Sequence, residues 1–169
     1  MTSEPLNRIR SATSSDAALV AAIDAASAIV HAPHVPALID DLLALGLSWI
    51  AEVGGKPAGY AIVSRRFYSR AFIELLAVAP DFRRGGVGGG LLKACSAAFA
   101  DEILFTSTNQ SNGPMQALLA KTGFEASGVI HNLDPGDPEL IYVRHSQPSS
   151  MIADSSRPLS DSPRRKARR

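Results

Sequence analysis

The segment "VAPDFRRGGVGGGLLKAC" (residues 78–95) places five glycines among the six positions from 85 to 90. A glycine inside a helix costs roughly 1 kcal/mol relative to alanine, so a run of this density needs a physical reason. The apolar run at 72–78 predicts a strand before the glycines, and the run at 91–100 predicts a helix after them. The glycines therefore fall where a strand turns into a helix.

A glycine turn that opens a helix favours a phosphate or pyrophosphate group, because the first N–H groups are unpaired and no Cβ obstructs an anion. Arg83 and Arg84 can bond phosphate oxygens beside it. The spacing of the glycines excludes two common phosphate-binding motifs. The dinucleotide fingerprint needs a third glycine at Leu91, and a Walker A loop needs Lys and Ser/Thr at Leu91 and Leu92. A merely flexible loop is the alternative, and the flanking strand, Pro80 and helix argue against it.

Two segments resemble motifs of one family. Arg83, Gly86 and Gly88 fit Q/R-x-x-G-x-G/A, and residues 78–92 are similar to the V-x-P-x-Y/F-R-G-x-G-I/V/L-G-x-x-L-L signature of the GNAT superfamily of N-acetyltransferases. The segment "NGPMQALLAKTGFEASG" (112–128) resembles N-x-x-A/M-x-x-L-Y-x-K-x-G-F of the same superfamily. The resemblance covers roughly residues 6–144 and is strongest over 72–124.

This resemblance implies an acetyl-CoA dependent N-acetyltransferase that moves the acetyl group directly to a primary amine, with acetyl-CoA as cosubstrate and no metal. In the family, the glycine segment holds the pyrophosphate, the preceding strand lines the acetyl group, and the asparagine of the second motif contacts the cofactor arm. The implied cofactor-binding residues here are Leu76, Ala77, Val78, Arg83, Arg84, Gly85, Gly86, Val87, Gly88, Gly89 and Asn112.

Glu74 is the candidate catalytic residue. A lysine-like ammonium with a pKa near 10.4 must lose a proton before it can accept an acetyl group. Glu74 is the one acidic residue in an apolar strand, and strict alternation places it on the face of Leu76 and Val78. It can act as the base directly or through water. The alternative is a glutamate at the rim with no role.

A leucine stands where many family members carry a tyrosine that protonates the departing thiolate. The residue here is Leu119, and Tyr60 and Tyr142 are the other hydroxyls that the sequence offers for this task. A thiol with a pKa of about 8.5 also leaves tolerably without help. Cys95 falls on the apolar side of a helix, so we expect it to pack in the core.

The order of elements is strand, two helices, three strands, helix, strand, helix and two strands. It predicts an α/β (mixed α+β) fold: one GNAT-like domain at residues 1–145 with a central mixed, mostly antiparallel sheet and helices on both faces. Residues 146–169 are rich in Ser, Pro and Arg, which predicts a disordered basic tail. Residues 151–169 hold six basic and two acidic residues, a net +4, whereas the first 150 hold 11 and 14, a net −3.

The composition is that of an ordinary globular protein, with 46% hydrophobic and 20% charged residues. No apolar run reaches the ~18 residues of a membrane span, and no leader precedes the domain, so we expect a cytoplasmic protein without membrane contact. The expected partner is an amine acceptor, either a small molecule or a protein, and the expected state is a monomer or homodimer. A catalytically silent acyl-CoA sensor is one alternative. A nucleic-acid-associated protein acting through "RRKARR" (164–169) is another.

Three weaker groups complete the candidates. His31 and His34 lack further ligands at metal spacing and are expected near the acceptor cleft. Asp40 and Asp41 are expected on a solvated helix face. The third group is Asp134, Asp137 and Glu139, which lie around two prolines. We expect these residues to form a turn, and the alternative is an electrostatic role toward a cationic acceptor.

Overall fold

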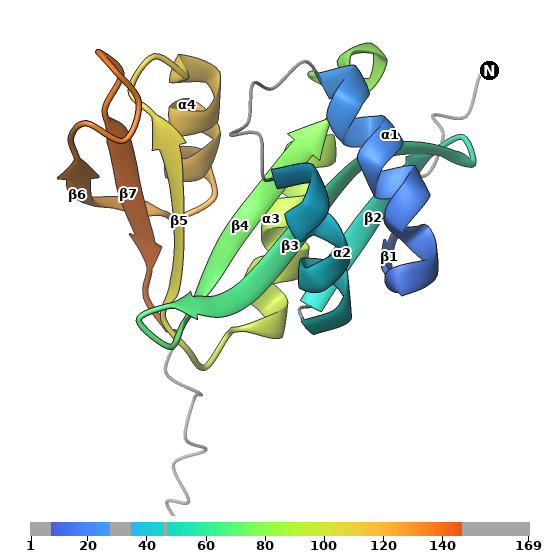
Figure 1. The fold of residues 1–169 in the computed structure, drawn as a ribbon, viewed down its shortest axis with the longest axis horizontal. Coiled ribbons are helices and arrows are strands. Elements are labelled where there is room, and N and C mark those ends of the chain that lie inside the picture. Colours follow the sequence, from blue (N-terminus) through green and yellow to red (C-terminus); the bar gives the residue numbers. More distant parts are fainter. Residues whose placement is uncertain (1–7, 28–34, 46, 147–169) are drawn as a thin grey trace, which may run out of the picture.

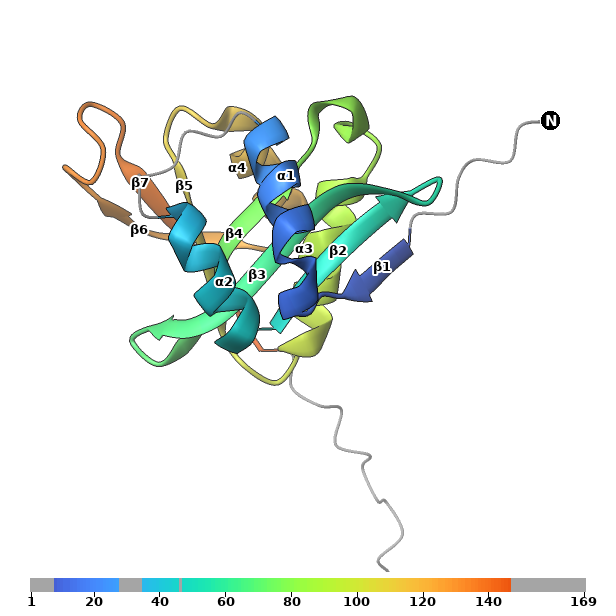
Figure 2. The ribbon, with the colours of Figure 1, turned by 45° about the vertical axis from the view of Figure 1, so that its right-hand side comes forward.

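The computed structural model describes residues 8–27, 35–45 and 47–146, which form one seven-stranded sheet with helices on both faces (Figures 1 and 2). The strands are β1 (Arg8–Ser11), β2 (Leu47–Val53), β3 (Lys56–Phe67), β4 (Arg70–Val78), β5 (Leu104–Asn109), β6 (Glu125–Ile130) and β7 (Glu139–Arg144). The helices are η1 (Ser14–Asp16), α1 (Ala17–Ser27), α2 (Val35–Leu45), η2 (Pro80–Phe82), α3 (Val87–Ala98) and α4 (Gly113–Lys121). This succession confirms the predicted order and adds the two short 3-10 helices.

The sheet order is β1-β2-β3-β4-β5-β7-β6, and every neighbouring pair is antiparallel except β4 and β5, which are parallel. The mixed, mostly antiparallel sheet predicted from the sequence is therefore confirmed. None of the helices in the described ranges is both long and apolar enough to cross a membrane.

Two hydrophobic clusters hold the layers together, one on each face of the sheet. Helices α1 and α2 bury Val20, Ile23 and Leu42 against Ile62 and Leu75. On the opposite face, α3 and α4 pack against the sheet through a second cluster. It includes Leu91, Leu92, Cys95, Leu119, Ala61, Ile73 and Tyr142. Each helix thus covers only one side of the sheet, as Figure 2 shows.

Helix α3 begins at Val87, inside the glycine segment, rather than at residue 91 as the sequence predicts. The early start is physically reasonable because the first turn of a helix has no internal partner for its N–H groups, whatever the side chain. The glycines at 88–90 therefore form the first turn of α3, and Gly86 is its N-cap.

Strands β4 and β5 pair over a short length and then diverge (Figure 1). Their register joins Ala71–Ile73 to Leu104–Thr106, and β4 then continues to Val78 with no strand of the described chain on that side. On the face of α1 and α2 the junction is supported by aromatic rings packed at tilted angles. Phe67 lies 4.8 Å from Phe72 and 5.4 Å from Phe105, measured between ring centroids. The divergence opens the sheet at its centre.

A β-bulge interrupts β4 at Glu74. Ile62 pairs with Leu75 and Val63 pairs with Ile73, so Glu74 is an extra residue with no opposite partner in β3. An extra residue reverses which face the following side chains occupy. The strict alternation predicted for this strand is therefore wrong: Leu76 and Val78 pack with the α3 cluster, whereas Glu74 does not share their face.

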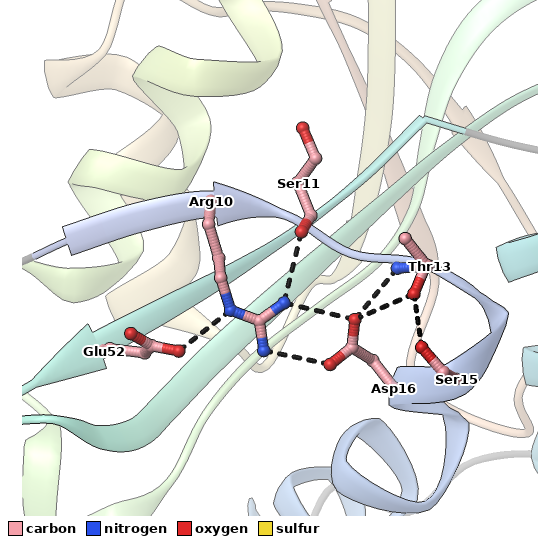
Figure 3. Close-up of polar contacts among 6 residues, drawn as sticks. All are labelled: Arg10, Ser11, Thr13, Ser15, Asp16 and Glu52. Atoms are coloured by element: carbon pink, nitrogen blue, oxygen red, sulfur yellow. Dashed lines mark hydrogen bonds and ion pairs between the residues drawn. The ribbon is translucent and has the colours of Figure 1, made fainter.

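Arg10 anchors the start of α1 (Figure 3). Its guanidinium donates to both carboxylate oxygens of Asp16 at 2.9 and 3.1 Å and to Glu52 at 2.8 Å. These bonds join β1, β2 and η1, the short helix that leads into α1. The hydrogen bonds from Arg10 are the main cause that lowers the pKa of Asp16 to about 2.

Candidate active site

A cavity of about 650 Å³ lies where β4 diverges from β5, within the usual size range of small-molecule sites. Residues of β4, the following loop, α3 and α4 line it, together with the end of α1. Every predicted cofactor-binding residue lines this cavity except Gly85. The residues that sequence reasoning missed are Ser27, Phe82, Pro114, Met115 and Leu118. Met115 and Leu118 belong to the second motif, whereas Ser27 carried no local signal.

The N-terminus of α3 supplies the polar end of the cavity. The first backbone hydrogen bond runs from Gly90 N to Gly86 O at 2.9 Å, so the N–H groups of residues 87–89 have no partner within the helix. Gly86 has a φ of +81°, a left-handed conformation that glycine adopts without strain. These N–H groups and the positive end of the helix dipole favour an anion.

Close packing explains the glycine at position 88. A Cβ there would lie 3.0 Å from Cδ2 of Leu118 on α4, tighter than ordinary contact. The missing side chain therefore allows α3 and α4 to approach each other across the cavity.

Arg84 and Arg83 differ in their surroundings although both line the cavity. Both residues are exposed, and Arg84 has a φ of +65°, a conformation that is unusual for a residue with a side chain. Arg83 instead donates from Nε to the Val78 carbonyl at 3.2 Å and from Nη2 to the Ser27 carbonyl. Two of its three nitrogens are thus engaged with the backbone.

The exposed edge of β4 forms the long side of the cavity. Ala79 N donates to Ala58 O in β3 at 2.9 Å, so by alternation the polar backbone groups of Ala77 also face β3. Those of Leu76 and Val78 then face the side on which β5 diverges. An extended ligand can pair with such an edge as an added strand would.

Asn112 performs a structural task at the cavity. Its Oδ1 accepts a hydrogen bond from Met115 N at 3.2 Å and so caps α4. Its Nδ2 has no hydrogen-bond partner within the described ranges. The side chain can therefore cap the helix and still donate to a ligand.

Glu74 does not line the cavity and lies nearby on the sheet. Its Oε1 accepts a hydrogen bond from the Ser64 hydroxyl, which itself accepts from Arg66 N at 3.1 Å. Because the neighbouring Val63 packs with the α3 cluster, Ser64 points to the opposite face. The carboxylate thus lies on the face covered by α1 and α2.

The hydroxyl candidates do not line the cavity. The Tyr60 hydroxyl donates to Asp24 Oδ1 at 2.5 Å, and its burial raises its pKa above the ordinary value. Tyr142 and Leu119 pack in the α3 cluster, where Leu119 has no exposed surface. Cys95 is fully buried, and burial raises the pKa of its thiol to about 12, so its predicted packing role is confirmed.

The three weaker groups of candidate site residues differ in what the structure shows for them. His31 and His34 lie outside the described residues. Asp40 and Asp41 are exposed on α2, which confirms the predicted solvated face. The loop between β6 and β7 contains the predicted turn, in which Asp137 N donates to Asp134 O at 3.3 Å. The two side chains bond the connection between β5 and α4: Asp134 accepts from Asn109 at 2.8 Å, and Asp137 accepts from the Ser111 amide and hydroxyl at 2.9 and 2.6 Å. Burial is the main cause that raises the pKa of Glu139.

Comparisons with known proteins agree with this arrangement. The sequence model of the acetyltransferase (GNAT) family matches residues 21–124. Among curated proteins, none matches the sequence.

Solved structures share the fold. An acetyltransferase of the GNAT family from Bacillus cereus is 26% identical, with a TM-score of 0.72 over 84% of this chain and 99% of that one. The ribosomal-protein-S18-alanine N-acetyltransferase of Escherichia coli is 20% identical, with a TM-score of 0.71 over 87% and 99%. A Bacillus anthracis structure described as a streptothricin acetyltransferase in complex with acetyl coenzyme A is 18% identical, with a TM-score of 0.53 over 61% and 64%. Since the family model spans more than half of the 169 residues, this chain belongs to the acetyltransferase (GNAT) family and is an acyltransferase enzyme.

Proposed function

We propose that this acyltransferase binds acetyl-CoA in the cavity beside β4 and transfers the acetyl group directly to a primary amine. One observation carries the proposal: the unpaired N–H groups of α3 and the exposed edge of β4 border the same cavity. The helix end suits a pyrophosphate, and the strand edge suits the amide-bearing arm that extends from it.

The proposed cofactor residues divide by their chemistry. Arg84 and the backbone of residues 86–89 receive the pyrophosphate. The backbone groups of Leu76 and Val78 pair with the pantetheine arm and hold the thioester carbonyl, Ala77 lies between them on the same strand, and Asn112 donates to the same arm from Nδ2. Bound in this way, acetyl-CoA supplies the activated acetyl group.

Glu74 is the proposed proton acceptor. The acceptor amine loses a proton to the Glu74 carboxylate, directly or through a water molecule, before its nitrogen forms a bond to the acetyl carbon. The nitrogen, positively charged once this bond has formed, loses its second proton to solvent water. The carbon–sulfur bond breaks and the sulfur leaves as a thiolate. Leu119 offers no hydroxyl, so we propose that the thiolate leaves without a protein acid, which a thiol pKa of about 8.5 allows.

The acceptor is proposed only as a primary amine of a small molecule or a protein. The E. coli neighbour acts, by its name, on an alanine of ribosomal protein S18, and at 20% identity it supports the fold alone. A cytoplasmic location, a monomer or homodimer, and a domain at 1–145 followed by a disordered tail stay predictions from the sequence. The basic segment 164–169 lies outside the described residues.

Two measurements on the full chain test the function. Calorimetry gives the affinity for CoA, and thiol release from acetyl-CoA is followed over a panel of amines. The proposal expects CoA binding and amine-dependent thiol release. Gly86→Val should weaken CoA binding strongly while the circular dichroism spectrum is preserved, because valine does not tolerate a φ of +81° and the loop must shift. CoA binding without thiol release across the panel would favour a sensor instead.

A further inference from the structure

Helix α1 is attached to the rest of the molecule at both ends by an arginine. At its start, Arg10 bonds Asp16 of the preceding η1 (Figure 3). At its end, Arg83 donates to the carbonyl of Ser27, the last residue of the helix. The second contact joins positions 56 residues apart in the sequence.

The Arg83 contact places a cation at the last turn of α1 that the structure describes. A cation near the C-terminal end of a helix interacts favourably with the helix dipole. The Ser27 hydroxyl donates to Asp24 O at 2.6 Å within the same turn. Asp24 in turn accepts from Tyr60 of β3 at 2.5 Å. Separate hydrogen bonds thus link Arg83 to Ser27, Ser27 to Asp24 and Asp24 to Tyr60 of the sheet.

The same guanidinium also holds the end of β4. Arg83 Nε donates to the Val78 carbonyl at 3.2 Å, on the exposed edge beside the cavity. Ser27 is 2% exposed and lines the cavity as well. Arg83 therefore joins two walls of the cavity. Arg84, which is exposed like Arg83, lines the same cavity and makes no hydrogen bond within the described residues.

We propose that Arg83 is a positioning residue: it fixes the C-terminal turn of α1 against the end of β4, so that a ligand in the cavity also orders α1. Arg84 supplies the charge for the phosphate groups. Helix α1 covers the face of the sheet on which Glu74 lies. The Arg83 contact therefore couples the proposed cofactor cavity to the face that carries the proposed base, Glu74. The part of this inference that concerns ordering of α1 by a bound ligand rests on the proposed function.

The test compares Arg83→Lys with the matched variant Arg84→Lys. Both keep the positive charge, but a lysine has a single ammonium group and cannot replace the two fixed donors of a guanidinium. Amide hydrogen exchange is measured for residues 24–27 in the free full-length protein and with saturating CoA. Calorimetry gives the CoA affinity of each variant.

In the free protein we expect Arg83→Lys to speed exchange at residues 24–27 by about ten-fold, the effect of losing a charge-assisted hydrogen bond. Arg84→Lys should stay within about two-fold of the original protein. CoA should slow exchange at these amides in the original protein and in Arg84→Lys, and should slow it far less in Arg83→Lys. Arg83→Gln, which lacks the charge, serves as a second variant with the same expected direction.

Unchanged exchange in both Arg83 variants would overturn the proposal. So would a large loss of CoA affinity in Arg83→Lys with normal exchange at α1, which would make Arg83 a phosphate ligand. If the original protein does not bind CoA, the proposed function fails. The free-protein comparison then still decides whether Arg83 holds α1.

Discussion

The Ser64 hydroxyl donates its proton to Oε1 of Glu74. A carboxylate oxygen can only accept, which fixes the direction of this hydrogen bond, and the Ser64 oxygen itself accepts from the Arg66 amide. The other carboxylate oxygen, Oε2, has no hydrogen-bond partner in the described part of the chain. Ser64 therefore orients the carboxylate and leaves one oxygen for an incoming amine or water.

Glu74→Gln should lower kcat by on the order of 10²-fold and displace the acidic limb of the pH–rate profile, because the amide cannot accept the amine proton. Ser64→Ala should lower kcat less, by roughly five- to ten-fold, since it removes one orienting hydrogen bond. The double variant should be no slower than Glu74→Gln, because Ser64 acts through Glu74. Steady-state kinetics check all three, and multiplicative losses in the double variant would separate the two residues.

Gly88→Ala and Gly89→Ala add the same methyl group to the first turn of α3. At position 88 the Cβ lies 3.0 Å from Leu118 Cδ2, whereas at position 89 it lies 3.7 Å from Leu118 Cδ1, an ordinary contact. We expect Gly88→Ala to weaken CoA binding several-fold more than Gly89→Ala, because Leu118 must move within the cavity wall. Calorimetry on both variants decides the point, and equal affinities would contradict it.

Leu119→Tyr should destabilise the protein by about 1–3 kcal/mol, because a larger side chain enters a packed core. Leu119 has no exposed surface and does not line the cavity. CoA affinity should change little. Urea unfolding and calorimetry measure these effects. A faster enzyme of unaltered stability would show that a tyrosine at 119 reaches the thiolate after all.

Burial of the Cys95 thiol should make the free energy of unfolding fall as the pH rises into the alkaline range. Burial raises its pKa from 9.0 to about 12, so between these values the unfolded chain has lost the proton that the folded protein keeps. The free energy of unfolding must then decrease as the pH rises, by up to about 1.4 kcal/mol per pH unit from this group. Urea unfolding of the protein and of Cys95→Ala at several pH values should give curves that converge above pH 9. Parallel curves would contradict the assignment.

A chain that ends at Ser146 should keep its melting temperature and its affinity for acetyl-CoA, because residues 147–169 show no periodic apolar face. Thermal unfolding and calorimetry on the shortened chain check this. A drop of several degrees would mean that the removed segment contacts the domain.

The glycine segment and the order of elements could be predicted from the sequence because their signals are local. Strand, turn and helix follow one another within residues 72–100, and so do the motifs that lie on them. The start of α3 was missed by four residues because helix propensity treats the glycines as interior positions, whereas the structure places them in the first turn.

The remaining site features depend on contacts between distant segments. The bulge at Glu74 is defined by the register with β3, which no pattern within β4 reveals. The sequence predicts that Arg83, beside the glycines, is a phosphate ligand. Its hydrogen bond to the Ser27 carbonyl depends on how α1 packs, which the local sequence does not reveal. Alignment with a motif identifies position 119, but only the packing of α4 decides that its side chain enters the core.

The short pairing between β4 and β5 also affects how the two parts of the sheet stay together. Among the residues that the structure describes, strands β1–β4 pair with β5–β7 only through Ala71–Ile73 and Leu104–Thr106. The cavity is lined from both sides, by β4 on one and by α4 on the other. A molecule bound there contacts both parts at once and adds to the short connection between them. We expect the two parts of the sheet to separate more easily in the free protein than in the ligand-bound one.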